Sequence, residues 1–532
     1  HWDFLDDLLR ALHFPRAFSK WIMACVSRVE FFLHLNGRIH GSFRGRRGLR
    51  QGDPLSPLLF VLAMEYFSRI MRKASTLPNY KHHPHCKPLN LTHLMFADDL
   101  IIFGKADLPT IQVMKEALGT FSSCTGLEAN LHKSQIFLGG CPNALHNQCI
   151  QTMGFQEGSL PMNYLGIPIT TSRLTKMECS ILVDKITARV HIWATRNLSF
   201  AGRAMLINNV IFGMFNYWAS IFLLPQSVLD KITSICRNYL WGGKEVLTRI
   251  PHISWANTCK AKKHGGAGIK DYTAWNKAII AKLVWAIATK KDTLWVKWVH
   301  GRYLRRKNWW DYSPPGDCSW TWKKICATKE IFKAGCSTPH IWTFQGHDNY
   351  KVRYGYQWLI GGAMVPWGKV IWARASIPRH AFISWICVQH RLPTKKRLSR
   401  FAPRSDIHCA LCLSAEEDIT HLFSECPYAA EVWGSLSQWW QHPFHASGRP
   451  LKDMTDSLAV LTTPKAHKQI TFAIFAAGIY FIWLARNQLI FKNHRTSAAQ
   501  TVKMIKDQIR HRILFLNYST NTYSSFIDVI LR

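Results

Sequence analysis

The sequence has 532 residues, with 67 Lys and Arg against 32 Asp and Glu, so its formal net charge is +35. Hydrophobic residues make up 48% of the chain and aromatic residues 13%, which excludes a disordered, solvating chain. The length excludes a single small module and suggests several domains. A positive excess of this size repels itself unless a polyanion shares it, which favours nucleic acid as a partner ahead of an anionic membrane. A merely basic surface is the alternative.

Cysteine content and hydropathy indicate where the chain resides. Its 15 cysteines are an odd number, and no apolar secretory segment opens the chain. This argues against a disulfide framework and predicts a reducing environment, the nucleus and cytoplasm. Residues 470–485 are apolar but shorter than the ~20 residues of a bilayer span, so we expect a buried helix and no membrane partner. The chain opens at His1 inside a predicted helix, which suggests an N-terminally truncated protein.

Hydrophobic periodicity predicts mixed helices and strands in the first 140 residues, the pattern of an α+β domain. Two amphipathic helices, residues 2–12 and 16–28, precede a β pair at residues 30–44 that turns at Asn36-Gly37. A loop at residues 48–57 leads to an apolar helix at residues 58–72. Predicted next are a β hairpin at residues 94–103, a helix at 109–124 and a strand near 134–138.

The remaining chain is mostly helical by pattern. Residues 171–289 show helical spacing with a glycine-rich break at residues 265–268. Residues 295–356 are rich in Trp and Gly without clear periodicity, which indicates a connector. Clustered cysteines follow, and residues 441–532 form a predicted helical tail.

The most informative short motif is Phe96-Ala97-Asp98-Asp99, two adjacent carboxylates at a predicted tight turn between apolar strands. If these strands are buried, they bring the acids to a sheet edge, where two like charges repel unless a divalent cation lies between them. Mg²⁺ prefers such hard oxygen ligands, and paired ions stabilise the attacking and leaving oxygens of phosphoryl transfer. The alternative is a plain Asp-Asp turn, since Asp is common in turns.

The order and spacing of further motifs resemble a non-LTR (LINE-type) retrotransposon reverse transcriptase of the plant kind, over nearly the whole chain. The matching segments are Arg50-Gln51-Gly52-Asp53-Pro54-Leu55-Ser56-Pro57, the Asp98-Asp99 motif, Gly126-Leu127, Asn130, Lys133-Ser134, Tyr164-Leu165-Gly166-Ile167-Pro168 and Leu198-Ser199-Phe200-Ala201-Gly202-Arg203.

This resemblance implies an architecture and a reaction. The implied parts are a partial right-hand polymerase palm (1–170), a thumb-like helical region (171–290), a connector (291–356), a zinc-binding domain (357–440) and a helical C-terminal region (441–532). The implied activity is RNA-directed DNA polymerisation, with an RNA template, a DNA primer and deoxynucleoside triphosphates as partners and Mg²⁺ as cofactor.

The resemblance also assigns residues. Asp98 is the principal metal ligand, and Asp99 is a weaker ligand or a structural partner. Arg50, Gln51 and Gly52 belong to the loop that lies against nucleotide and template, where glycine permits close backbone approach. Lys133 approaches the nucleotide phosphates or is a solvated surface lysine.

One departure affects the expected activity. By the resemblance, the family's third carboxylate lies upstream of the first predicted helix. Asp3, Asp6 and Asp7 fall within that helix, where negative charge near the N-terminus stabilises the helix without any catalytic role. With two of three ligands we expect poor polymerisation. The alternative function is a non-catalytic nucleic-acid-binding remnant or a domesticated RNA-binding protein.

A second constellation is Cys409-x2-Cys412-x8-His421-x4-Cys426, whose three thiolates and one imidazole predict a closed, structural Zn²⁺ site. Unbound cysteines are the alternative. The surrounding sequence is similar to the zinc-binding domain that follows the polymerase in the same plant elements. Basic and aromatic residues there are candidates for gripping phosphates and stacking bases, or form a solvated basic helix. They are Arg379, His380, Trp385, Lys395, Lys396, Arg397 and Arg400.

Overall fold

The structure, a computed structural model, describes residues 1–336, 343–401, 406–444 and 450–516. The chain forms two compact units. Unit 1 contains residues 1–171 and 286–313, and unit 2 contains residues 172–285 and 314–532.

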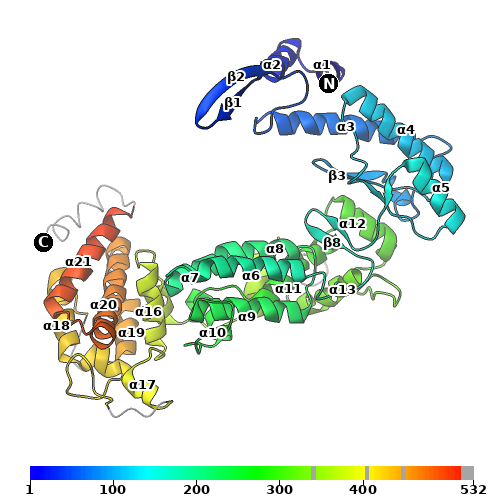
Figure 1. The fold of residues 1–532 in the computed structure, drawn as a ribbon. Coiled ribbons are helices and arrows are strands. Elements are labelled where there is room, and N and C mark those ends of the chain that lie inside the picture. Colours follow the sequence, from blue (N-terminus) through cyan, green and yellow to red (C-terminus); the bar gives the residue numbers. More distant parts are fainter. Residues whose placement is uncertain (337–342, 402–405, 445–449, 517–532) are drawn as a thin grey trace. The chain divides into compact units, whose positions relative to one another are not determined.

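Unit 1 combines helices with four two-stranded sheets, in agreement with the α+β prediction (Figure 1). Neighbouring strands pair in antiparallel fashion, except for the parallel pair of β5 and β6. Its elements are α1 (Trp2–Ala11), α2 (Arg16–Ser27), β1 (Glu30–Leu35), β2 (Arg38–Arg44), α3 (Ser56–Ala74), η1 (Lys87–Leu89), β3 (His93–Phe96), β4 (Asp99–Ile102), α4 (Leu108–Thr125), β5 (Gln135–Ile136), α5 (Asn143–Met153), β6 (Gln156–Glu157), β7 (Met162–Tyr164), β8 (Ile167–Ile169), α12 (Leu294–Val299) and η4 (His300–Leu304).

The helices and hairpins of residues 1–125 lie close to the predicted ranges, whereas α5 and the β7–β8 hairpin were not predicted. The β1–β2 turn uses Asn36 and Gly37 at φ +48° and +80°, the left-handed conformation that this dipeptide favours. Helix α3 packs on α4, and Phe67, Met71 and Phe121 lie in the core that they share. One face of the β3–β4 hairpin packs on this core through Met95.

Unit 2 is predominantly helical in the residues that the structure describes. Its elements are α6 (Ser180–Ala194), α7 (Phe200–Leu206), η2 (Ile207–Ile211), α8 (Phe212–Ala219), α9 (Gln226–Gly242), α10 (Trp255–Cys259), η3 (Lys262–His264), α11 (Tyr272–Ala288, whose last turn belongs to unit 1), α13 (Trp320–Lys333), α14 (Val352–Ile360), α15 (Pro366–Ile371), α16 (Pro378–Val388), α17 (Lys395–Ser399), η5 (His421–Glu425), α18 (Pro427–Trp440), α19 (Leu451–Ala459), α20 (Lys465–Lys492) and α21 (Ala498–Leu514).

Two sequence features have a clear role in unit 2. Ser199 caps α7, because its hydroxyl accepts a hydrogen bond from the amide of Gly202 at 3.2 Å. In the glycine-rich break, a β-carbon on Gly266 would lie 1.9 Å from the carbonyl oxygen of Lys260, so only glycine fits there. The neighbouring Gly265 carbonyl accepts a hydrogen bond from the indole of Trp385 in α16 at 2.9 Å.

Three helices lie in the segment that showed no clear periodicity. They are α12, α13 and α14, and their Trp and Tyr residues obscure a regular apolar stripe. In unit 2, the α13 and α14 segments pack on α11 through Phe332, Tyr356 and Trp285.

The C-terminal region contains α19, α20 and α21, while residues 445–449 and 517–532 of the predicted tail lie outside the described residues. Helix α20 has 28 residues and is long and apolar enough to cross a membrane, but 78% of its apolar window is buried inside the protein. It packs on α16, α18 and α21 (Figure 1). The predicted buried helix at residues 470–485 is therefore confirmed, with longer ends.

Candidate functional site

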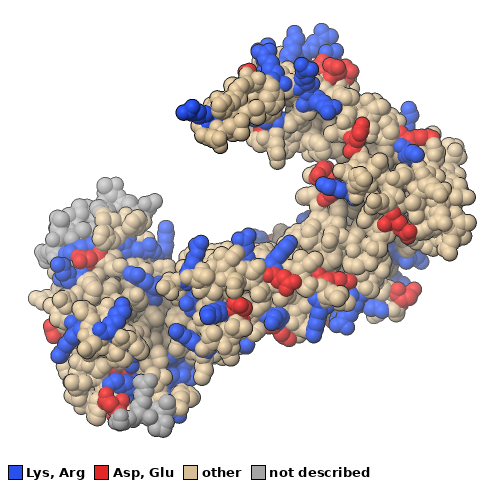
Figure 2. Space-filling model, viewed as in Figure 1, with Lys and Arg blue, Asp and Glu red and all other residues tan. Residues whose placement is uncertain are grey.

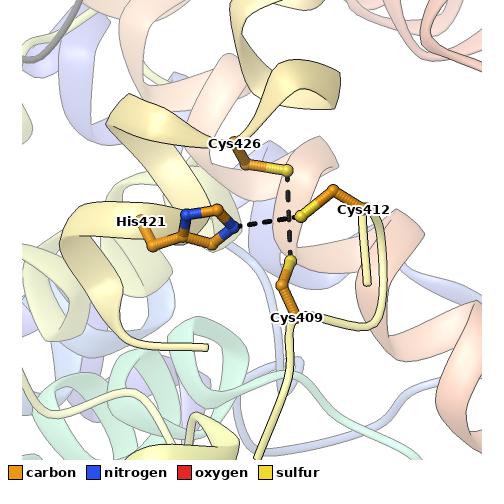
Figure 3. A group of neighbouring side chains, drawn as sticks. All are labelled: Cys409, Cys412, His421 and Cys426. Atoms are coloured by element: carbon orange, nitrogen blue, oxygen red, sulfur yellow. Dashed lines mark hydrogen bonds between the residues drawn. The ribbon is translucent and has the colours of Figure 1, made fainter. Parts of the chain in front are cut away.

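The side chains of Cys409, Cys412, His421 and Cys426 converge on one point (Figure 3). Their four ligand atoms lie within 4.8 Å of one another. The Cys409 and Cys426 sulfurs are 4.0 Å apart, and the Cys412 sulfur is 3.2 Å from Nε2 of His421. A tetrahedral zinc ion with Zn–S of about 2.3 Å and Zn–N of about 2.0 Å holds its ligand atoms about 3.5–3.8 Å apart. The donor set and spacing therefore fit Zn²⁺.

A tight loop brings the first two ligands together. The Cys409 amide donates to the Ala415 carbonyl at 2.7 Å, and the Leu413 amide donates to the Cys409 carbonyl at 2.8 Å. Leu413 has φ +63°, so the chain reverses direction directly after Cys412. Two cysteines separated by two residues thus face the same side of the loop.

A short helical turn supplies the other two ligands. His421 begins η5, and its amide donates to Oδ1 of Asp418 at 2.8 Å. The Cys426 amide donates to the His421 carbonyl at 2.7 Å, and Cys426 directly precedes α18. Hydrogen bonds of this one turn therefore hold the backbone of both His421 and Cys426 in place.

Two of the three thiols are fully buried, and the hydrogen bond between them shifts their pKa values in opposite directions. Cys409 and Cys426 are 0% exposed. A hydrogen bond from Cys426 lowers the pKa of Cys409 to about 5, and the same contact raises the pKa of Cys426. The Ser414 hydroxyl donates to the Cys412 sulfur at 3.1 Å. Four nitrogen and sulfur ligands complete the shell, which is the arrangement of a structural zinc site.

The acidic residues of this segment have other partners. Glu417 is buried and forms an ion pair of 2.6 Å with Arg486 of α20. Glu416 and Asp418 pair with Lys396 at 2.7 and 3.6 Å. This ion pair was not predicted from the sequence, because Glu417 and Arg486 are 69 positions apart and no local pattern connects them.

The base contacts predicted for His380 and Trp385 are wrong. His380 and Trp385 are both 0% exposed and belong to the core, so neither stacks on a base from solvent. Lys395 pairs with Asp406 at 2.7 Å, as Lys396 pairs with its two acids. The phosphate contacts of the basic residues in this segment stay predictions, since 44% of the Lys396 side chain remains exposed.

The Asp98-Asp99 motif lies at the turn of the β3–β4 hairpin, where Phe96 pairs with Asp99. Both carboxylates are exposed, and no ion pair in the described residues involves either. Ala97 has φ +51°, which costs a residue with a β-carbon roughly 1–2 kcal/mol. The expected burial of these strands holds on one face only: Met95 packs on the core, whereas Leu94 and Phe96 are 39% and 61% exposed.

A second hairpin lies beside these carboxylates. Burial and the negative charge of Asp99 raise the pKa of Tyr164, the last residue of β7. The β7–β8 turn at Leu165 and Gly166 has φ +50° and +78°. The two motifs Asp98-Asp99 and Tyr164-Leu165-Gly166 are therefore neighbours in unit 1.

The loop at residues 48–57 is held by its own side chains. Oδ1 of Asp53 accepts a hydrogen bond from the Leu55 amide at 2.8 Å, and the Ser56 hydroxyl donates to the Arg50 carbonyl at 2.7 Å. Gly52 has φ +93°, which only glycine adopts readily. Arg50, Gln51 and Gly52 are exposed.

Lys133 lies in a separate exposed turn, and its amide donates to the Asn130 carbonyl at 3.1 Å. Within the part of the chain that is described, no hydrogen bond or ion pair joins Gln51, Gly52 or Lys133 to the aspartate hairpin.

Two families match the chain. Residues 1–169 match the reverse transcriptase (RNA-dependent DNA polymerase) family, which contains the Asp98-Asp99 hairpin. Residues 350–433 match the family described as zinc-binding in reverse transcriptase, which contains all four zinc ligands.

Curated relatives agree with these matches. A protein of Arabidopsis thaliana named as a ribonuclease H protein is 30% identical over 163 residues, 30% of this chain and 26% of that protein. A transposon TX1 protein of Xenopus laevis is 24% identical over 275 residues, 50% of this chain and 20% of that protein. The Pol polyprotein of the type-2 retrotransposable element R2DM of Drosophila melanogaster is 29% identical over 274 residues, 49% of this chain and 24% of that protein.

The chain thus spans about a quarter or less of the length of these three relatives. The two matches stand in the order expected from the sequence, a reverse transcriptase segment followed by a zinc-binding segment, which is consistent with a non-LTR reverse transcriptase of the plant kind.

Proposed function

We propose that this chain is the part of an RNA-directed DNA polymerase that carries two of its metal ligands, its palm-to-thumb region and its zinc domain. The complete protein extends a DNA primer on an RNA template. The observation that carries this proposal is the exposed Asp98-Asp99 hairpin within residues matched to reverse transcriptases. Residues 1–170 correspond to part of the palm and the helical region 171–290 to the thumb.

Magnesium suits the aspartate hairpin. Carboxylate oxygens are the ligands that Mg²⁺ prefers, and both side chains are exposed at one turn. Asp98 and Asp99 would hold the metal, which supplies stabilisation of negative charge on the reacting oxygens during phosphoryl transfer. In the described residues, the Cys/His cluster is the one group of three or more ligand side chains close enough to share an ion.

The remaining proposed contacts concern positioning. Gly52 lacks a side chain at an exposed loop position, so a nucleotide or template strand can approach the backbone of Arg50 and Gln51 closely. Lys133 is exposed and would neutralise phosphate charge. Positioning supplies most of the catalysis in phosphoryl transfer, so these residues affect rate as well as binding.

Primer extension tests this function. Asp98→Asn in a protein extended upstream of His1 should abolish extension of a DNA primer on an RNA template with Mg²⁺. Asp7→Asn is the matched control, because Asp7 is also an exposed aspartate of unit 1 and lies in α1. Extension retained by Asp98→Asn, or lost equally in the control, contradicts the assignment. The 532-residue chain alone should extend the primer poorly.

The second candidate function is nucleic-acid binding without polymerisation, which the net charge of +35 favours. Figure 2 shows Lys and Arg spread over the visible face, with fewer Asp and Glu. This reading predicts salt-dependent binding of RNA by the chain even when the extended protein fails to polymerise. A flat dependence of the binding constant on salt concentration would remove it. The nucleus and cytoplasm are the proposed location.

A further inference from the structure

A polar cavity of about 530 Å³ lies in unit 2. This volume is within the range of roughly 300–1,000 Å³ that is typical of small-ligand pockets. The lining comes from α10 and the connection before it, from the connection after α16, and from α17. None of the lining residues is acidic: they are Pro251, His252, Ile253, Ser254, Asn257, Gln389, Arg391 and Arg397.

The chain does not neutralise the basic residues of this cavity. Within the residues that the structure describes, His252, Arg391 and Arg397 form no ion pair. The two residues just before Arg397 are lysines, and each of them has an acidic partner at 2.7 Å. The acidic side chains of this segment thus pair with the neighbours of Arg397 and leave the residues of the cavity without a counter-charge.

The arginines in and around the cavity repel one another. Burial lowers the pKa of Arg397, and so do the charges of Arg391 and Arg400. Burial also lowers the pKa of His252, as do the charges of Arg397 and Arg249. An anion between these side chains would replace their repulsion by attraction, because an opposite charge nearby stabilises a cation.

Hydrogen-bond donors in the cavity remain available to an anion. The Arg397 guanidinium donates one N–H group to the His390 carbonyl at 3.3 Å. A guanidinium has five N–H donors in a fixed fork that matches phosphate oxygens, so most of its donors remain. The Ser254 hydroxyl accepts a hydrogen bond from the Asn257 amide at 3.4 Å, and its own hydrogen can donate to a ligand.

The lining also indicates what the ligand lacks. The imidazole of His252 is the one aromatic ring among the lining side chains, and it already packs edge to face with Trp241 at 5.3 Å and with Phe200 at 6.0 Å. A nucleobase therefore has no open aromatic surface in this cavity. Two arginines close together in one cavity instead favour closely spaced phosphate groups.

We propose that this cavity binds a small polyphosphate that carries no base, held by Arg391 and Arg397 with Ser254 and Asn257. The bound ligand joins α17 to the connection between α9 and α10. The proposal goes beyond the proposed polymerase function, because it involves neither the aspartate hairpin nor a template.

The ligand also supports the zinc-ligand segment through α17. The amide of Lys395 donates to the carboxylate of Glu417 at 2.9 Å, and the amide of Lys396 donates to its carbonyl at 3.2 Å. Arg397 follows directly in the same helix. A polyphosphate on Arg397 therefore holds the helix on which Glu417 is seated.

Equilibrium dialysis of radiolabelled inorganic triphosphate against the zinc-loaded full chain tests the site. The chain should bind triphosphate saturably at physiological ionic strength. Arg391 is exposed, so Arg391→Gln should fold normally and weaken binding about tenfold or more, as expected for loss of charge-assisted hydrogen bonds. Arg374→Gln/Arg495→Gln is the control, because it removes two exposed arginines of unit 2 that do not line the cavity. Equal weakening in both variants would overturn the site.

Competition distinguishes this ligand from other phosphates. An excess of oligo(dT) should leave triphosphate bound, and thymidine triphosphate should bind no more tightly than inorganic triphosphate. Displacement by oligo(dT) would assign the cavity to a nucleic-acid backbone, and tighter binding of thymidine triphosphate would assign it to a nucleotide, so either result overturns the proposal. Neither measurement requires primer extension, so both can be interpreted if the proposed polymerase function fails.

Amide hydrogen exchange tests the link to α17. Bound triphosphate should slow exchange of residues 395–399 in the unaltered chain and leave it unchanged in Arg391→Gln. Unchanged exchange in the unaltered chain at saturating triphosphate would contradict the link.

Discussion

The carboxylate of Glu417 and the guanidinium of Arg486 form an ion pair of 2.6 Å, with side-chain exposures of 0% and 3%. Glu417 lies between the second and third zinc ligands, and Arg486 lies in α20. The carboxylate also accepts hydrogen bonds from the amides of Lys395 at 2.9 Å and Ala410 at 3.3 Å. The zinc-ligand loop is thereby tied to the long core helix by a fully buried charge pair.

Removing one partner should be costly. Arg486→Met leaves the Glu417 carboxylate buried and unpaired, which should lower the free energy of unfolding by about 3–5 kcal/mol. Glu417→Gln/Arg486→Met should recover part of this loss, because glutamine is neutral and still accepts hydrogen bonds from Lys395 and Ala410. Calorimetric unfolding of the zinc-loaded chain measures both. If the double variant is no more stable than Arg486→Met, the buried charge is not the cause.

Zinc content should follow the four ligands and no other cysteine. Cys409→Ala removes one buried ligand, so elemental analysis should find less than one zinc per chain and the zinc domain should unfold at lower temperature. Cys387→Ala is the control, since Cys387 is equally buried but lies outside the cluster. Zinc loss in the control, or full zinc retention by Cys409→Ala, would contradict the site.

Gly478 in α20 should tolerate no side chain. A β-carbon there would lie 2.4 Å from the indole of Trp433, which packs between α18 and α20. Gly478→Ala should therefore destabilise the protein by about 1–3 kcal/mol through overpacking. Gly434→Ala in α18 should instead stabilise it by up to about 1 kcal/mol, because nothing lies within 4 Å of its β-carbon and alanine favours the helix. Melting temperatures of the two variants should shift in opposite directions.

The buried ring of His380 predicts a pH dependence. Burial and the charge of Arg379 lower its pKa to about 3, so the folded protein keeps the imidazole neutral. The unfolded chain protonates it below about pH 6.5, so folding stability falls as the pH drops from about 6.5 toward 3, by at most about 1.4 kcal/mol per pH unit. His380→Phe lacks this penalty. As the pH is lowered from 7 to 5, the free energy of unfolding of His380→Phe should therefore rise relative to that of the unaltered chain. A difference that does not change with pH would show that the pKa of His380 is not lowered in the folded protein.

Features set by local sequence were predictable. Cys409 and Cys412 lie in one loop, and the two short strands beside Asp98 are joined by one turn. In both cases the residues that meet in space are close in sequence, so the local pattern predicts the contact. Helices with a clear apolar stripe, such as α1 and α4, were found for the same reason.

Features that depend on distant residues were not predictable. Glu417 and Arg486 are 69 positions apart, and neither signals its partner. His380 and Trp385 look like accessible basic and aromatic residues in the sequence, and only the packing of α16 against α20 and the glycine-rich break places them in the core. The helices α12, α13 and α14 were missed because their aromatic residues are not confined to one face.

Helix α20 supplies contacts that the zinc-ligand segment needs, although it lies outside the residues matched to the zinc-binding family. The family match ends at residue 433, within α18, whereas Arg486 and Gly478 lie beyond it. A protein fragment of residues 350–433 would retain all four metal ligands but would leave the Glu417 charge unmatched and the Trp433 indole uncovered. The matched segment is thus shorter than the packed region around the zinc site, and a fragment that keeps the Glu417–Arg486 pair and covers Trp433 must include α20.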